Sequence, residues 1–122
     1  MTGSRQLSGD QLAAIAREMS RLKSDLYGKG PTASKAYQND DIVFCVLRGG
    51  LTQVEQALVK SNDESLVRQV RLRFQEHMRP SFEGAVERIT GRRVLTYNSQ
   101  ILFDPDMVIE VFVLDSGAPE QD

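Results

Sequence analysis

Apolar side chains recur at three- and four-residue spacing early in the chain, which predicts an amphipathic helix from Ser8 to Tyr27. The apolar positions of this helix are Leu12, Ile15, Ala16, Met19, Leu22 and Leu26. Ser8 and Gln11 have the spacing of a capping box, which indicates where the helix begins. The polar positions Arg17, Glu18, Arg21 and Lys23 are expected on the solvent side. The sequence "GKGP" then ends the helix, because glycine can adopt the left-handed conformation and proline cannot continue a helix.

Two pairs of extended runs predict two β-hairpins. In the first, "SKAYQNDDIVFCVL", the turn-favouring residues 39–41 separate two strands. Its second strand, Ile42 to Leu47, has no polar alternation, which is typical of a strand covered on both faces. In the second hairpin a proline turn at residues 104–106 precedes a strand that is apolar on both faces around Glu110. One face of that strand carries Met107, Ile109, Val111 and Val113, and the other carries Val108, Phe112 and Leu114.

Capping boxes between the hairpins predict a short helix from Thr52 and a longer one from Ser61. On the long helix the apolar pattern places Leu66, Val67, Val70, Phe74 and Met78 inward, and Arg68, Arg71 and Gln75 outward. Pro80 is expected to kink this helix, which resumes its apolar face and ends at Thr90 and Gly91.

These elements predict an α+β domain with an antiparallel sheet of about four strands, formed by two hairpins. An N-terminal helix and a helix pair accompany the sheet, and the last helix is long and kinked at Pro80. We expect a single domain over residues 9–115, with disordered ends at residues 1–8 and 116–122, because the ends have no apolar core segment.

The doubly apolar strands also predict self-association. If the helices cover one face of the sheet, the other face leaves an apolar patch that a second subunit can cover. This favours a homo-oligomer, a dimer, and the predicted interface residues are Phe44, Val108, Phe112 and Leu114. In the competing arrangement the helices wrap both faces.

Composition narrows the function classes. Fifteen Lys and Arg against seventeen Asp and Glu give a formal net charge of −2, which does not favour nucleic acid as a partner. No run reaches the roughly 18 to 20 apolar residues of a membrane span, so we expect a soluble, cytoplasmic chain without direct membrane insertion. Cys45 is the single cysteine and His77 the single histidine. Neither has partners at metal-ligand or catalytic spacing, so we expect no metal, no cofactor and no catalytic residue.

The segment "YGKGPTASKAY" allows two interpretations. It can simply stop the first helix, or its amides and basic side chains can form an anion site. The glycines follow a helix and therefore lie beside the negative end of its dipole, which favours the first interpretation. If an anion binds, the candidate residues are Lys29, Gly30, Thr32, Lys35, Arg92 and Arg93.

Several segments together resemble one known family: "YGKGPTASKAY", "LTQVEQALVK", "LVRQVRLRFQEHMRPSFEGAVERITGRRV" and "DPDMVIEVFVL". Over residues 12–115 the chain is similar to the MpsC-type domain family, formerly a domain of unknown function. The family is named after a sodium-translocating, membrane-potential-generating system linked to inorganic-carbon uptake, whose ion-moving subunits are separate membrane proteins. The resemblance implies a soluble accessory role and supplies no catalytic residues.

From these observations we expect a non-enzymatic accessory or regulatory interaction domain, dimeric, acting on a membrane-associated or cytoplasmic protein partner. The resemblance adds a link to sodium-dependent ion translocation or inorganic-carbon uptake. The alternative is a sensor of a small anion or metabolite, such as bicarbonate, a nucleotide or a carboxylate. An enzyme ranks third, because no acid and base are paired at a recognisable spacing.

Overall fold

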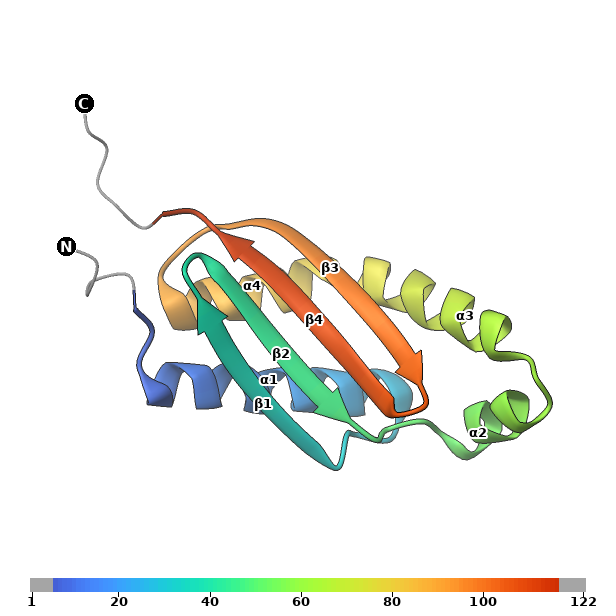
Figure 1. The fold of residues 1–122 in the computed structure, drawn as a ribbon. Coiled ribbons are helices and arrows are strands. Elements are labelled where there is room, and N and C mark those ends of the chain that lie inside the picture. The colour runs from blue at the N-terminus through green and yellow to red at the C-terminus, as the bar shows by residue number, and fades with distance from the viewer. Residues whose placement is uncertain (1–5, 117–122) are drawn as a thin grey trace.

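A computed structural model describes residues 6–116 of the chain, and Figure 1 shows its four helices and four strands. In chain order the elements are α1 (Gly9–Tyr27), β1 (Ala33–Asn39), β2 (Ile42–Arg48), α2 (Gln53–Lys60), α3 (Glu64–His77), α4 (Arg79–Thr90), β3 (Val94–Phe103) and β4 (Asp106–Leu114). The α+β class and the two predicted hairpins are confirmed.

The strands form one antiparallel sheet in the order β1-β2-β4-β3. The two hairpins therefore meet through their second strands, β2 and β4, which occupy the centre (Figure 1). In this central pair Phe44 lies opposite Val111, and Val46 lies opposite Ile109. Residues directly opposite one another point to the same face of a sheet. The register therefore decides which apolar side chains share a face.

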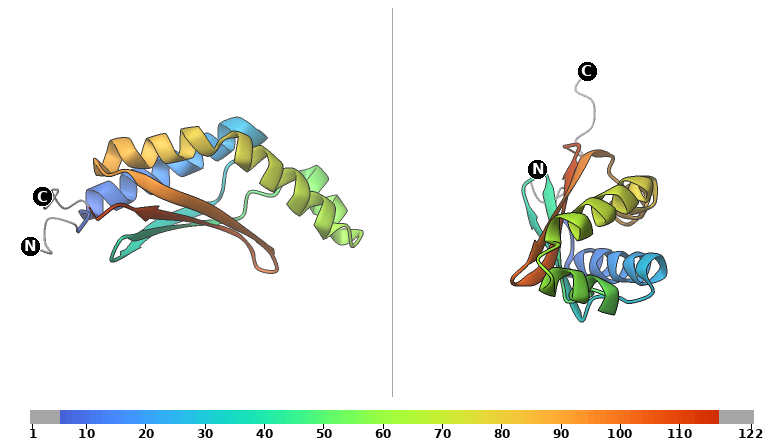
Figure 2. Two further views of the ribbon diagram at one scale, coloured as in Figure 1. Left: turned by 90° about the horizontal axis from the view of Figure 1, so that it is seen from above. Right: turned by 90° about the vertical axis from the view of Figure 1, so that its right-hand side faces the viewer.

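Helices lie on only one side of the sheet in the part of the chain that the structure describes (Figure 2). On β2 the buried residues are Val43, Cys45 and Leu47, and on β4 they are Val108, Glu110, Phe112 and Leu114. These side chains pack against α1 and α4, where Ile15, Met19 and Phe82 complete the core. The domain thus has two layers, one of helices and one sheet, and the face of the sheet away from the helices is open.

The ends of α1 follow the predicted local chemistry. The Ser8 hydroxyl accepts a hydrogen bond from the Gln11 amide at 3.0 Å, and the Gln11 side chain accepts one from the Ser8 amide at 2.8 Å. Gly28 ends the helix with φ at 75°. Leu7 is buried and its amide donates to the Gln38 side chain, so the folded part extends into the segment expected to be disordered. The rest of that expectation, at residues 1–5 and 117–122, lies outside the described residues.

The long kinked helix is a wrong prediction, because two separate helices occupy that segment. Helix α3 ends at His77, Met78 follows, and α4 begins at Arg79 with Pro80 in its first turn. A proline is tolerated in the first turn because the amide it lacks has no partner there. Pro80 therefore starts a new helix.

The predicted faces of α3 are also largely reversed. Arg71 and Gln75 are buried together with Val67, whereas Leu66, Val70 and Phe74 are exposed. Lys23 of α1, expected on the solvent side, is buried as well. The physical reason is that these polar groups find partners beneath the helices.

No described helix combines the length and the apolar character that crossing a bilayer requires.

We expect Cys45 to be unreactive in the folded protein. Burial raises the pKa of its thiol to about 12, so the reactive thiolate is scarce at neutral pH. A colorimetric thiol reagent at pH 8 should label the chain within seconds in 6 M guanidinium and more slowly by orders of magnitude in buffer. Equal rates in the two solvents would show that β2 is not covered as described.

Candidate functional site

A buried charge pair lies at the centre of the molecule, between Lys23 of α1 and Glu110 of β4. The Lys23 ammonium donates hydrogen bonds to Glu110 Oε2 and to the side-chain oxygen of Gln75 on α3. Gln75 in turn donates to the Ser99 hydroxyl of β3 at 2.9 Å, and Ser99 is 3.3 Å from Glu110 Oε2. Four elements therefore meet at one carboxylate, which we call the Glu110 cluster (Lys23, Gln75, Ser99 and Glu110).

Burial dominates the electrostatics of this cluster. It lowers the pKa of Lys23, and the charge and hydrogen bond of Glu110 oppose that shift. Burial also raises the pKa of Tyr97, with the Glu110 charge adding to the effect, so the Tyr97 hydroxyl keeps its proton. Among the described residues, the Tyr97 hydroxyl and Glu110 Oε1 are buried without a hydrogen-bond partner.

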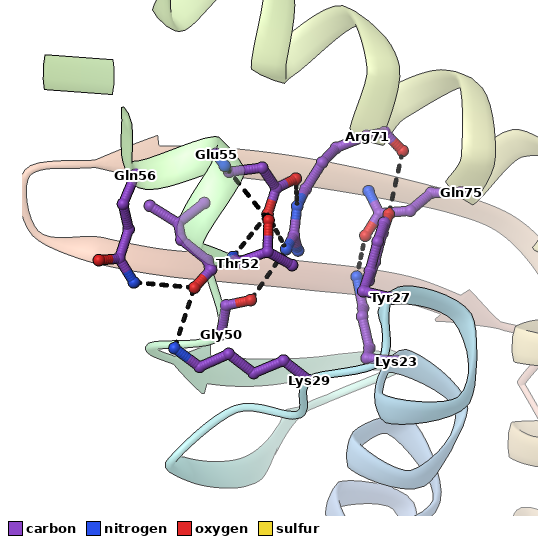
Figure 3. Close-up of polar contacts among 10 residues, drawn as sticks. Lys23, Tyr27, Lys29, Gly50, Thr52, Glu55, Gln56, Arg71 and Gln75 are labelled. Carbon is purple, nitrogen blue, oxygen red and sulfur yellow. Dashed lines mark hydrogen bonds and ion pairs between the residues drawn. The ribbon is translucent and has the colours of Figure 1, made fainter. Parts of the chain in front are cut away.

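A second buried ion pair joins Arg71, one helical turn before Gln75 on α3, to Glu55 of α2. Nε and Nη2 of Arg71 each donate to a carboxylate oxygen of Glu55 at 2.7 Å, and Nη2 also donates to the Gly50 carbonyl oxygen at 2.9 Å. The guanidinium lies 3.9 Å from the ring centroid of Tyr27, a cation–π geometry. Figure 3 shows these groups converging from α1, α2, α3 and the segment after β2.

The local sequence explains why Glu55 is available for this pair. Glu55 is the third residue of α2, and it completes a capping box with Thr52, whose amide donates to its carboxylate at 2.9 Å. Burial would raise the pKa of Glu55, but the hydrogen bonds from Arg71 and Thr52 outweigh burial and lower it. The predicted cap is confirmed, and its carboxylate also binds the guanidinium of Arg71.

Lys29 and Gln56 extend the network to the loop after α1. Both side chains donate to the Leu51 carbonyl oxygen at 3.0 Å (Figure 3). The Lys29 ammonium therefore fixes the loop against the start of α2. No group of three or more His, Cys, Asp or Glu side chains in residues 6–116 is arranged to hold a metal ion. The buried ion pairs and hydrogen bonds join the secondary-structure elements, and the charged side chains that form them bind other groups of the same chain.

The six residues predicted for an anion site do not come together. Lys29, Gly30 and Thr32 lie where β2 ends, whereas Arg92 pairs with Asp41 at 2.6 Å where β2 begins. The seven residues of β2 separate the two groups by about 20 Å, at roughly 3.3 Å per residue. Lys35 lies between them and its ammonium is 5.2 Å from the Tyr37 ring centroid, while Arg93 is exposed. The fold therefore does not gather these six residues at one place.

The predicted interface residues divide between the two faces of the sheet. Val108, Phe112 and Leu114 are buried against the helices and cannot form a contact surface. Phe44 lies on the open face, because its register partner is Val111. The open apolar face of the two central strands consists of Ile42, Phe44, Val46, Met107, Ile109, Val111 and Val113, all partly exposed.

Sequence reasoning missed Lys23, Arg71 and Gln75 as buried residues. A signal was present: Lys23 follows Ile15 and Met19 at four-residue steps, and so do Arg71 and Gln75 after Val67. Residues four apart share a face of a helix, so each polar group continues a buried apolar row.

Comparison with known proteins identifies one family. The family model described as "Na+-translocating membrane potential-generating system (MpsC)" matches residues 8–116 of the chain. No curated protein and no solved structure matches the sequence or the fold.

We expect Lys23→Met to lower the free energy of unfolding by about 3 to 5 kcal/mol, because it leaves the buried Glu110 carboxylate without a cation. Lys23→Met combined with Glu110→Gln should lose clearly less than the sum of the two single variants, since neither charge remains. Urea unfolding followed by circular dichroism measures all four proteins. Additive losses would show that the two groups are not coupled.

We expect Glu55→Gln to destabilise the protein by about 3 kcal/mol at pH 7, because Arg71 loses its counter-charge. The folded-state pKa of Glu55 is lowered, so its contribution is complete above the ordinary value of 4.5 and disappears as the pH falls through the folded-state pKa. The difference between wild type and variant should therefore shrink in acid. Urea midpoints from pH 7 to pH 3 measure it, and a difference that stays constant with pH would contradict the assignment.

Proposed function

This chain belongs to the MpsC family, and on that premise we propose that it is a non-enzymatic accessory or regulatory domain that acts by binding other proteins. Family membership links the chain to a Na⁺-translocating, membrane-potential-generating system. Within that system, we propose, the chain binds a second copy of itself. It also binds a protein partner that is membrane-associated or cytoplasmic.

The open apolar face of the sheet carries this proposal. The two central strands, about 4.8 Å apart and paired over seven residues at roughly 3.3 Å each, give this apolar face a footprint of roughly 220 Å², and the two edge strands bring the whole face of the sheet to roughly 450 Å². An exposed apolar patch that polar residues border is typical of a contact surface between proteins, and the edge strands supply that border with Lys35, Asn98 and Gln100. Two such faces stacked about 10 Å apart would form the core of a sandwich with a total footprint of roughly 900 Å², which is the size of a weak or transient interface.

The charged groups support binding over catalysis. Lys23, Glu55, Arg71 and Glu110 are buried and paired with one another. A catalytic acid or base needs a substrate proton within reach. In this chain the partners of these groups are other side chains of the fold, whose positions they fix.

We expect the full chain to have the mass of a dimer in size-exclusion chromatography with light scattering. Ile109→Asp places a charge at the centre of the open face and should yield a monomer, because a buried unpaired carboxylate is costly. Ser81→Asp adds the same charge on an exposed position of α4, on the helical side, and should leave the dimer intact. A wild type that is monomeric at 100 μM, or a folded Ile109→Asp variant that stays dimeric, would refute this interface.

A further inference from the structure

Three exposed apolar side chains form a row along α3. Leu66, Val70 and Phe74 are 41%, 42% and 45% exposed, and their four-residue spacing aligns them on one face of the helix. Gln69 and Arg73 join Val70 and Phe74 around a shallow hollow of about 310 Å³. We call Leu66, Val70 and Phe74 the α3 row.

The fold prevents α3 from burying this row. Arg71 is held by Glu55 and the Gly50 carbonyl oxygen, and Gln75 is held by Lys23 and Ser99. Rotating α3 about its axis to turn the row inward would withdraw both side chains from these partners. Two buried charges, on Glu55 and Lys23, would then lose hydrogen bonds, which is strongly unfavourable for charges held out of water. The apolar side of α3 is therefore held facing solvent by its own polar side.

We propose that the α3 row is the docking surface for an amphipathic helix of a partner protein. The backbone groups of a helix are satisfied internally, so α3 cannot pair with an added strand. A row with four-residue spacing is instead the ridge that packs into the groove of a second helix. This inference rests on the proposed function and specifies the kind of partner that the domain binds.

Charge specifies the partner further. Arg73 lies at the edge of the hollow and is exposed, with no ion pair among the described residues. The matching helix carries a carboxylate side chain at the position facing Arg73, beside apolar residues at three- or four-residue spacing.

A second copy of this chain fits the row less well. Two α3 helices packed antiparallel about Val70 would bring Arg73 beside Gln69 of the other copy, where it finds no carboxylate. The open face of the sheet is the surface assigned to the second copy, and it lies on the other side of the molecule from α3 (Figure 2).

Photocrosslinking tests the proposal. The photoreactive amino acid p-benzoylphenylalanine replaces Phe74 in the full chain, expressed in the cells that naturally produce it. The matched control carries it at Leu72, which is 40% exposed on the same helix but points about 160° away from Phe74. Crosslinked peptides are sequenced by mass spectrometry, and the peptide obtained at Phe74 is then synthesised.

Binding of that synthetic peptide is measured by fluorescence anisotropy. We expect an acidic peptide with helical apolar spacing, which becomes helical when bound. Val70→Asp and Arg73→Glu should each weaken its affinity about tenfold or more. Leu72→Asp should change the affinity less than about twofold, as expected for an exposed site outside the interface.

Three outcomes would overturn the proposal: no product at Phe74 above the Leu72 control, a product formed with another copy of this chain, or an affinity that Val70→Asp leaves unchanged. Light scattering on the same variants separates this proposal from the dimer. If the wild-type chain is dimeric but does not bind the peptide, the docking surface is refuted and the sheet interface stands. If the chain is monomeric yet binds the peptide, the reverse holds.

Discussion

The buried charge pair between Lys23 and Glu110 fixes how the helices lie on the sheet. Taking two charges out of water costs several kcal/mol each, and only good geometry with further hydrogen bonds offsets that cost. Glu110 lies on β4, and its neighbours come from α1, α3 and β3. None of these elements can move alone without removing a hydrogen bond from one of the two buried charges. The pair therefore favours one arrangement of the layers over others that would bury similar apolar area.

Arg71 extends this constraint along α3 and explains its unusual orientation. Its ion pair with Glu55 and its contact with Tyr27 connect α3 to α2 and to the end of α1. The helix thus attaches through polar groups and leaves apolar groups outside. The sheet also leaves apolar side chains uncovered, on its side away from the helices. Because the two surfaces lie on different sides of the molecule, the two proposed contacts do not compete for the same surface.

The elements that the sequence predicted depend on neighbouring residues. The capping boxes at Ser8 and Thr52, the glycine helix ends and the turns of both hairpins act within a few positions, so the pattern alone identifies them. The capping box predicted at Ser61 is wrong, because α3 begins at Glu64 after Asp63 without a side-chain cap. The four-residue row of Val67, Arg71 and Gln75 was a signal for the rotation of α3, but the burial of its polar members depends on partners elsewhere in the chain. Lys23, which contacts both Gln75 and Glu110, is 52 residues from the first and 87 residues from the second. The open face of the sheet could not be predicted for the same reason, because it too depends on contacts with distant parts of the chain. Both faces of β4 are apolar, and only the side on which α1 and α4 pack decides that Val111 is outside and Phe112 inside.

The distribution of polar and apolar groups favours a function by contact. Four cations that could have formed an anion site or an active site have partners inside the chain: Lys23, Lys29, Arg71 and Arg92. Several large apolar side chains, by contrast, are left at the surface, five of them on α2 and α3. Burying charge and exposing apolar area both reduce the stability of an isolated chain. Contact with other proteins would offset the second of these costs, which agrees with the accessory role proposed above.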